Sequence, residues 1–181
     1  MHSIPTQNTT VFPPYHNIGK RDILIFPKFN NIEVLQNIRK QYDRLASCIA
    51  PHITLAFPFN HEMTDAVLIQ KLTHLLQTQQ PFHVTFQGVT FSKDGYIFLN
   101  CVKGCENIIE LHSRIDQEIL PFSHHTSQEY IPHITLGTTN SDTILPNFSD
   151  TFTTIIDTIS VERIGEQEES ILIGHIPLGR T

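Results

Sequence analysis

The chain has 181 residues, of which 39% are hydrophobic and 17% are charged. This composition predicts one folded domain, or two closely joined lobes, and argues against an intrinsically disordered chain. The formal net charge of −6 argues against a strong non-specific grip on long nucleic acid, because such binding needs a basic face. A small phosphorylated ligand or an RNA end is compatible with this charge.

The cysteines and the apolar runs indicate the cellular compartment. Cys48, Cys101 and Cys105 are an odd number without close pairing, so we expect buried free thiols and not a disulfide framework. No second cysteine pair completes a zinc site. No apolar run approaches the ~20 residues of a membrane span, and residues 1–5 lack the pattern of a secretory signal. The sequence therefore predicts a cytoplasmic protein without a membrane segment.

Between residues 20 and 80 the sequence predicts two pairs of a strand and a helix. Apolar residues at steps of three and four mark one face of each helix. Asn30 or Asn31 is expected to cap the first helix, and Thr64 the second. The expected elements are a strand at 21–26, a helix at 31–45, a strand at 49–57 and a helix at 64–79.

From residue 82 onward the pattern favours hairpins. Phe82, Val84 and Phe86 alternate with polar residues, Gly88 is expected to mark a bulge or bend, and residues 93–95 read as a hairpin turn. The further expected elements are a strand at 96–101, a helix at 105–120, a polar loop at 122–128, strands at 130–137, 152–156, 159–164 and 171–176, and an acidic hairpin turn at 166–169. Hairpins among alternating helices and strands predict an α+β fold with largely antiparallel sheets.

An internal repeat is the most informative feature of the sequence. Residues 51–55 read Pro-His-Ile-Thr-Leu, and residues 132–136 repeat this pentapeptide 81 residues later. Each copy follows a predicted helix and loop and begins a predicted strand, which indicates two related lobes. We interpret residues 1–19 as an N-terminal extension and residues 20–181 as a single bilobed domain with one motif per lobe. Because proline cannot donate to a ladder, each copy is expected at a strand start or edge.

The side chains of the repeat predict acid–base chemistry. Residues two apart on a strand share a face, so His52 projects with Thr54, and His133 projects with Thr135. Two imidazoles with pKa values near ~6.5 can act as base and acid at neutral pH. With hydroxyls to hold phosphate oxygens, the set suits in-line displacement at a phosphodiester. We expect no metal and no cofactor, since no Asp or Glu accompanies the histidines as a third ligand. The alternative is a pair of satisfied structural histidines from an ancient duplication.

Two His-x-Thr motifs, each at the start of a strand in a duplicated α+β chain, resemble the two-histidine phosphoesterase superfamily. Within it the chain looks like the 2′-5′ RNA ligase-like proteins, also called RNA 2′,3′-cyclic phosphodiesterases, over about residues 20–178. The resemblance implies a duplicated bilobed fold in which two mainly antiparallel sheets face a central cleft, with helices on the outside. It also implies that His52 and His133 are the acid–base pair and that Thr54 and Thr135 hold the phosphate.

The substrate is less closely defined than the motif residues. Members that act on RNA often place a basic residue shortly after one motif, whereas residues 56–59 and 137–139 contain none. This favours a nucleotide, a short oligonucleotide end or another small cyclic phosphate over a long RNA. Phe57 and Tyr130 are candidates for stacking a base, with core packing as the alternative. Arg21 is a candidate for contacting a phosphate, with a solvated strand end as the alternative. Phe91 is expected to pack in the core.

The sequence therefore predicts a metal-independent, monomeric phosphodiesterase that acts on 2′,3′-cyclic phosphates or related nucleotide and RNA-end phosphodiesters. A non-catalytic protein that binds a nucleotide or an RNA end on the same fold is one alternative. An RNA 2′-5′ ligase is another, because a reversible reaction lets the two histidines exchange roles. The motifs leave open which histidine is the acid and which is the base.

Overall fold

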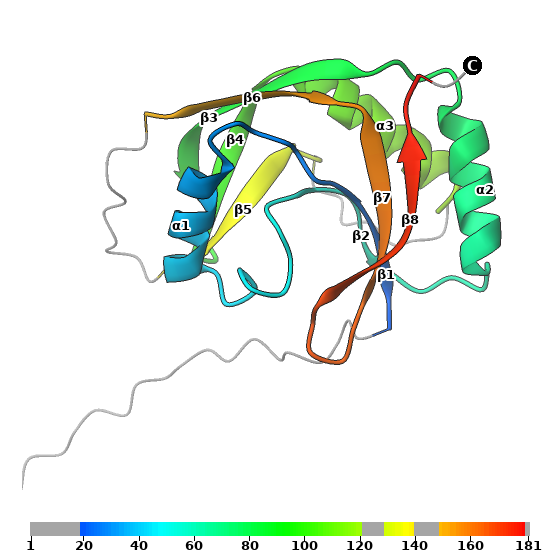
Figure 1. Ribbon diagram of the computed structural model, residues 1–181, viewed down its shortest axis with the longest axis horizontal. Helices are drawn as coiled ribbons and strands as arrows, with labels where there is room; N and C mark the ends of the chain where they lie inside the picture. The colour runs from blue at the N-terminus through cyan, green and yellow to red at the C-terminus, as the bar shows by residue number, and fades with distance from the viewer. Residues whose placement is uncertain (1–18, 121–128, 140–148, 180–181) are drawn as a thin grey trace, which may run out of the picture.

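The computed structural model describes residues 19–120, 129–139 and 149–179. The expected extension at 1–19, apart from its last residue, and the expected polar loop at 122–128 lie outside the described residues. The described chain forms eight strands and three helices (Figure 1). The strands are β1 (Arg21–Ile25), β2 (Ile53–Phe59), β3 (Phe82–Phe91), β4 (Tyr96–Lys103), β5 (His133–Thr138), β6 (Thr151–Ile156), β7 (Thr158–Ile164) and β8 (Ser170–Pro177), and the helices are α1 (Ile32–Tyr42), α2 (Asp65–Leu76) and α3 (Cys105–Glu118).

The strands form two four-stranded sheets. The first sheet has the order β2-β1-β7-β8 and the second sheet has the order β5-β4-β3-β6. Every strand pair is antiparallel, so the predicted α+β fold with two mainly antiparallel sheets is confirmed. The first sheet combines the earliest and the latest strands of the chain, and the second sheet comes from the middle.

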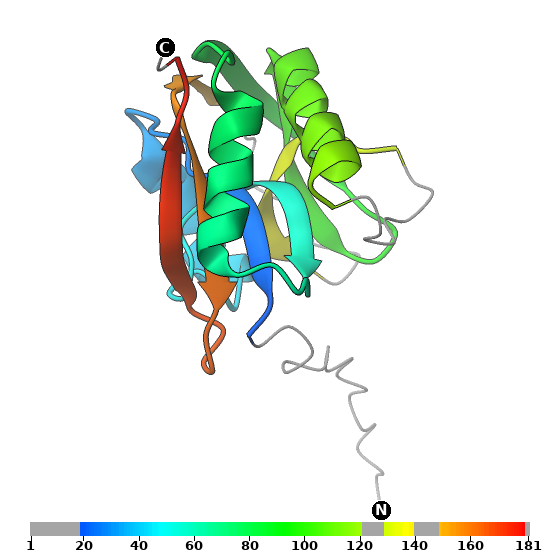
Figure 2. The same cartoon turned by 90° about the vertical axis from the view of Figure 1, so that its right-hand side faces the viewer.

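The helices lie on the outside of this pair of sheets. Helix α2 packs against β8, α3 packs against β2 and β4, and α1 packs against β5. Figure 2 shows α2 and α3 beside each other on one side of the molecule. Buried side chains from both sheets and from all three helices form one continuous hydrophobic cluster. The two sheets are therefore held by a shared core, which fixes the position of their edge strands relative to each other.

Most predicted elements are confirmed, and the main differences lie beside the two motifs. Helix α1 ends at Tyr42, although the apolar periodicity continues to Leu45. The Asp43 carboxylate accepts a hydrogen bond from the Leu45 backbone N–H at 2.9 Å, which favours a turn over another helical turn. Strand β2 begins four residues later than predicted, at Ile53, and β5 begins three residues later, at His133, because the preceding prolines have no N–H to donate to a ladder.

One predicted helix cap and the predicted bulge are confirmed, whereas the other predicted cap lacks its side-chain hydrogen bond. The Thr64 hydroxyl accepts a hydrogen bond from the Val67 backbone N–H, so the predicted cap of α2 is confirmed. Asn31 occupies the N-cap position of α1, but its side chain makes no capping hydrogen bond. Gly88 has a φ of 74° and lies where the β3–β4 register shifts, as the sequence predicted.

The prediction of three free, buried cysteines is wrong for two of them. Cys101 and Cys105 form a disulfide, and the free thiol among the described cysteines, Cys48, is half-buried. Gly104 adopts a φ of 73° between the end of β4 and the start of α3. This turn brings the two cysteine Cα atoms to 5.8 Å, a normal separation for a disulfide. Sequence spacing alone does not reveal such a turn.

Candidate active site

The two motifs lie on edge strands that meet between the sheets. Strand β2 is an edge of the first sheet, β5 is an edge of the second sheet, and the two strands contact each other. The residues of the two copies also have the same pattern of burial. In each copy the Pro, Ile and Leu are buried, whereas the His and Thr are half-buried. Each pair of His and Thr therefore shares the less buried face of its strand, as the alternation predicted.

The backbone repeats as closely as the sequence does. On β2, Thr54 lies opposite Leu24 and Ala56 lies opposite Ile23, so Leu55 has no partner on β1. On β5, Leu136 is skipped in the same way, because its neighbours Thr135 and Gly137 lie opposite Phe98 and Ile97. Each motif thus ends in a β-bulge at its leucine, and bulges re-aim side chains beside functional sites.

Both histidines are oriented by the same local hydrogen bond. The His52 Nδ1 lies 2.9 Å from the Ala50 carbonyl oxygen, and the His133 Nδ1 lies 2.7 Å from the Ile131 carbonyl oxygen. A carbonyl oxygen can only accept, so Nδ1 carries the proton in each ring. The Nε2 atom of each neutral ring is therefore left as the proton acceptor.

Burial changes the acid–base properties of both imidazoles. Desolvation lowers the pKa of His133 below its ordinary value of 6.5, and its bond to the Ile131 carbonyl opposes this effect. Desolvation also lowers the pKa of His52, against the opposing bond to the Ala50 carbonyl. The charges of Arg39 and His133 lower the pKa of His52 further, whereas Asp43 raises it. The two imidazoles are therefore close enough to influence each other, and both favour the neutral form at pH 7.

A small pocket joins residues of the two motifs. It has a volume of about 230 Å³ and includes His52 from the first motif and Thr135 from the second. The segment at the end of α1 and the residues around Tyr96 and Gly137 form its other walls. Such a pocket, between two lobes and with titratable groups in its lining, is a candidate site for a phosphorylated ligand.

A sequence profile of the 2′-5′ RNA ligase superfamily matches residues 27–163, a stretch that contains both motifs. The chain belongs to the 2′-5′ RNA ligase superfamily. The resemblance inferred from the two motifs is thus confirmed, and the chain is a 2′-5′ RNA ligase-like phosphoesterase by family. It is 28% identical over 120 residues to an Oceanobacillus iheyensis protein named as a candidate phosphoesterase, covering 65% of this chain and 69% of the relative. A Bacillus pumilus protein with the same kind of name is 24% identical over 153 residues, or 82% of this chain and 83% of the relative.

Solved structures show the same fold at low identity. Escherichia coli LigT, crystallised with 3′-AMP, matches with a TM-score of 0.65 and 14% identity over 90% of this chain and 99% of LigT. A Thermus thermophilus protein matches with a TM-score of 0.61 and 13% identity over 89% of this chain and 98% of its own. This 2′-5′ RNA ligase-like chain therefore has the LigT-like fold over most of its length.

Aromatic rings surround the histidines of this 2′-5′ RNA ligase-like protein. The Phe98 ring centroid lies 4.1 Å from that of His133, and Tyr96 stacks on Phe98 with centroids 5.9 Å apart. The Phe26 ring lies 6.0 Å from that of His52. Sequence reasoning missed Tyr96 and Phe98. The pairing of β4 with β5, which lies about 40 residues further along the chain, places them beside the second motif, and no local pattern in the sequence predicts this pairing.

The predicted stacking residues lie in different environments. Tyr130 stacks on His112 with ring centroids 3.8 Å apart, and its hydroxyl donates a 2.8 Å hydrogen bond to the Thr54 carbonyl. The chain that leads to the second motif is thereby tied to the strand of the first motif. Phe57 lies beyond the bulge on β2 with 47% of its surface exposed, and Phe91, which was expected in the core, is 51% exposed.

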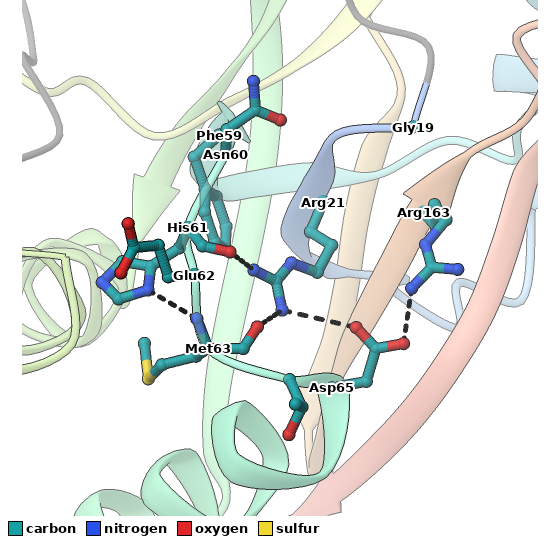
Figure 3. Close-up of a pocket in the computed structure, with 10 residues that line it drawn as sticks. Gly19, Arg21, Phe59, Asn60, His61, Glu62, Met63, Asp65 and Arg163 are labelled. Carbon is teal, nitrogen blue, oxygen red and sulfur yellow. Dashed lines mark hydrogen bonds and ion pairs between the residues drawn. The ribbon is translucent and has the colours of Figure 1, made fainter.

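The structure does not bring Arg21 together with the histidines. Arg21 pairs with Phe59 at the opposite end of β2 from His52, and a strand of this length separates the two ends by roughly 20 Å. Its guanidinium donates to the carbonyls of His61 and Met63 and to Asp65 (Figure 3). Arg21 is also only 6% exposed. This arginine therefore anchors the loop before α2 beside a separate pocket of about 800 Å³.

Two further features bear on ligands and membranes. Among the described residues, no group of three or more His, Cys, Asp or Glu side chains is arranged to hold a metal ion. In the same part of the chain, no helix is long and apolar enough to span a membrane.

Proposed function

We propose that this chain is a metal-independent phosphodiesterase that acts on 2′,3′-cyclic phosphates or related nucleotide and RNA-end phosphodiesters. The observation that carries the proposal is the equivalent presentation of two imidazoles. Each Nδ1 is bound to the carbonyl two residues earlier, and the two motif strands contact each other. In the proposed reaction, the two Nε2 atoms exchange protons on either side of one phosphate.

The proposed reaction needs one neutral and one protonated imidazole. The neutral Nε2 takes a proton from water as the water oxygen forms a new bond to phosphorus. The protonated Nε2 of the other histidine gives its proton to the ribose oxygen as the bond from that oxygen to phosphorus breaks. Thr54 and Thr135 donate hydrogen bonds to phosphate oxygens. After turnover the protonation states are exchanged, and proton exchange with water restores them.

The nature of the substrate rests on the pocket and on the relatives. The pocket of about 230 Å³ has room for a phosphate and part of its nucleoside, and an open side is needed for anything larger. Escherichia coli LigT has been crystallised with 3′-AMP and with ATP. A nucleotide or the terminal nucleotide of an RNA fits these observations better than an internal segment of a long RNA.

Phosphorus NMR tests the proposal directly. The protein is incubated with nucleoside 2′,3′-cyclic phosphates and with short RNAs that end in a cyclic phosphate, in the presence of EDTA. We expect turnover by the wild type and its loss in His52→Gln and His133→Gln. His74→Gln, which changes an exposed histidine of α2, is the matched control and should retain full activity.

Each result of this experiment has a clear meaning. Turnover that survives in either motif variant would overturn the assignment of the acid–base pair. Turnover that EDTA abolishes would overturn the metal-independent mechanism. Nucleotide binding without turnover of any substrate would favour a non-catalytic binding protein, and joining of RNA ends would favour a ligase.

A further inference from the structure

The pocket between the motifs contains an ion pair that the proposed chemistry does not use. Arg44 follows α1 and lines the same pocket as His52 and Thr135. Both terminal nitrogens of its guanidinium donate to the carboxylate of Glu168, with Nη2 at 2.8 Å from Oε1. Glu168 belongs to the turn between β7 and β8, which projects below the first sheet in Figure 1. A residue more than a hundred positions away therefore supplies the counter-ion of a pocket arginine.

The turn that carries Glu168 is built against the pocket wall. As the sequence predicted, residues 166–169 form a hairpin turn, closed by a 2.9 Å hydrogen bond from the Gly165 N–H to the Glu169 carbonyl. The Ser170 N–H donates to the Cys48 carbonyl at 3.1 Å, which attaches this turn to the segment that contains Arg44. Glu168 has a φ of 62°, a conformation that costs an L-residue free energy. The fold thus holds this carboxylate on Arg44 in spite of a local cost.

The pocket has a second arginine, Arg39, which is far less accessible to a ligand than Arg44. Arg39 is 1% exposed, and four of its five guanidinium N–H groups donate to Asp43, Gln36 and the Ile49 carbonyl. It is therefore a buried structural residue and not a ready partner for a ligand. The Arg44 side chain is 55% exposed and faces one carboxylate that is itself 21% exposed. An ion pair with this exposure is weak, so a ligand can replace Glu168 without breaking a buried network.

The chemistry of the guanidinium defines what would replace Glu168. A planar guanidinium binds a phosphate in the same two-pronged way as a carboxylate. A phosphate that carries more charge than a carboxylate competes well for this position. The sequence lacks a basic residue shortly after either motif, and Arg44 supplies one from before the first motif through the tertiary structure.

We propose that Arg44 forms a second phosphate subsite of this pocket and that Glu168 is its counter-ion until a substrate phosphate displaces it. The inference rests on the proposed function and makes the substrate more specific. The preferred substrate carries a phosphate in addition to the one that reacts, as a 5′-phosphorylated nucleotide or an oligonucleotide end does. A nucleoside 2′,3′-cyclic phosphate without a second phosphate leaves Arg44 bound to Glu168.

Two substrates that differ by one phosphate test this subsite. Adenosine 2′,3′-cyclic phosphate and its 5′-phosphorylated form contain the same reacting group. We expect Arg44→Gln to lower kcat/KM for the 5′-phosphorylated substrate by about tenfold, the loss expected for a charge-assisted contact, and to leave the other substrate nearly unchanged. Glu168→Gln should increase the preference for the second phosphate, because it removes the competing charge. Lys71→Gln, an exposed residue of α2, removes the same charge elsewhere and should change neither value.

Binding measurements keep this test separate from the test of catalysis. Calorimetry compares adenosine 3′,5′-bisphosphate with 3′-AMP on the wild type and on Arg44→Gln. Tighter binding of the bisphosphate, lost in Arg44→Gln, would support the subsite even if the wild type turned over neither substrate, and the proposed hydrolase alone would then fail. Equal binding of the two nucleotides, or an equal effect of Arg44→Gln on both, would overturn the subsite whether or not the protein is a hydrolase.

Discussion

The two motif histidines make the same kind of Nδ1 hydrogen bond, but their surroundings differ. His52 lies within the influence of Arg39, Asp43 and His133, whereas burial and the Ile131 carbonyl are the causes that act on His133. A positive charge on His133 lowers the pKa of His52, so protonation of one ring opposes protonation of the other. Acid–base catalysis by two imidazoles needs a state in which one ring is protonated and the other is neutral.

The pH dependence of the proposed reaction follows from these shifts. The value of kcat/KM should rise and fall with pH, since the base must be neutral and the acid protonated in the free enzyme. Both pKa values are lowered from 6.5, and a group with a lowered pKa loses its proton at a lower pH. Both limbs of the curve should therefore move to the acid side, with the maximum below pH 6.5. A kcat/KM profile with a cyclic nucleotide checks this, and a maximum on the alkaline side of 6.5 would contradict it.

Tyr130 links the two motifs through a single hydrogen bond. Tyr130→Phe keeps the ring on His112 but removes the hydroxyl that donates to the Thr54 carbonyl. Burial raises the pKa of the Tyr130 hydroxyl, so the donor proton is retained throughout the working pH range. We expect a loss of about 1 kcal/mol in the free energy of unfolding, or roughly 2–4 °C in Tm, measured by calorimetry.

A matched control distinguishes the lost hydrogen bond from the lost oxygen atom. Tyr42→Phe removes a hydroxyl for which the described part of the chain shows no hydrogen bond, and Tyr42 is half-buried like Tyr130. Its Tm should change by less than that of Tyr130→Phe. Equal changes in the two variants would mean that the bond to Thr54 contributes nothing measurable.

At the level of elements, the two motif strands differ where the pentapeptide ends. Ala56 follows the first bulge and Gly137 follows the second. Gly137 has a φ of 136°, and a Cβ at this position would lie 2.3 Å from the backbone carbonyl of Tyr42. Helix α1 packs against β5, and its last residue approaches β5 at this glycine. The second strand therefore needs a glycine where the first tolerates an alanine.

Gly137→Ala is accordingly a test of how α1 is seated. The substitution makes the second motif more similar to the first in sequence, but the added methyl must displace the backbone at Tyr42 and Asp43. We expect a loss of about 2 kcal/mol or more in the free energy of unfolding, from overpacking and from the positive φ. The activity should fall as well, because residues 42–45 form a wall of the pocket.

Urea denaturation and kcat/KM measure the two effects of this substitution. The mirror variant Ala56→Gly is the control, and we expect it to cost only about 0.5–1 kcal/mol through backbone entropy. If Gly137→Ala were as mild as Ala56→Gly, the close approach of α1 to β5 would have no energetic consequence.

The end of α1 also shows why element boundaries are hard to predict. Leu45 continues the helical periodicity, but it does so as part of the pocket wall and not of a helix. Asp43 binds Arg39 within α1 and the Leu45 N–H beyond it, and these side-chain bonds end the helix. Periodicity reports burial, and a buried residue in a turn gives the same signal as one in a helix.

For the whole molecule, the repeat allowed the family to be predicted, and the hairpins among alternating helices and strands allowed the fold class to be predicted, because both signals lie in the local sequence. The roles of the motif residues stay a prediction, and the repeat has a further limit. It did not reveal how the strands are shared between the sheets. The repeat suggests a division into two successive halves, whereas β7 and β8 return to pair beside β1. It also did not reveal Arg44 or Tyr96 as pocket residues. Both reach the pocket through contacts between segments distant in sequence, which leave no local pattern.

The pairing of β7 with β1 places two acidic residues opposite each other, which is electrostatically unfavourable. Asp22 on β1 lies opposite Glu162 on β7, and the two residues are only 7% and 4% exposed. Burial, and next the charge of Glu162, raise the pKa of Asp22 from 3.8 to about 7. Burial likewise raises the pKa of Glu162, although hydrogen bonds from Ser170 and Ser160 oppose this. One Asp22 carboxyl oxygen is buried without a hydrogen-bond partner, which fits a carboxyl group that is neutral in the folded chain.

The contribution of Asp22 to the stability of the folded chain should therefore decrease as the pH rises. Between about 3.8 and about 7 the folded state keeps a proton on Asp22 that the unfolded state has released, so each increase in pH favours unfolding. The shift of about three pKa units corresponds to a loss of up to about 4 kcal/mol in the free energy of unfolding, and this loss is complete above pH 7.

The variant Asp22→Asn tests this, because its side chain cannot ionise. It should match the wild type in stability near pH 4 and be clearly more stable at pH 8. Urea denaturation at both pH values measures this difference, with the exposed Asp94→Asn as the control that should show no such gain. An Asp22→Asn variant whose advantage over the wild type did not grow with pH would mean that Asp22 is already ionised in the folded chain.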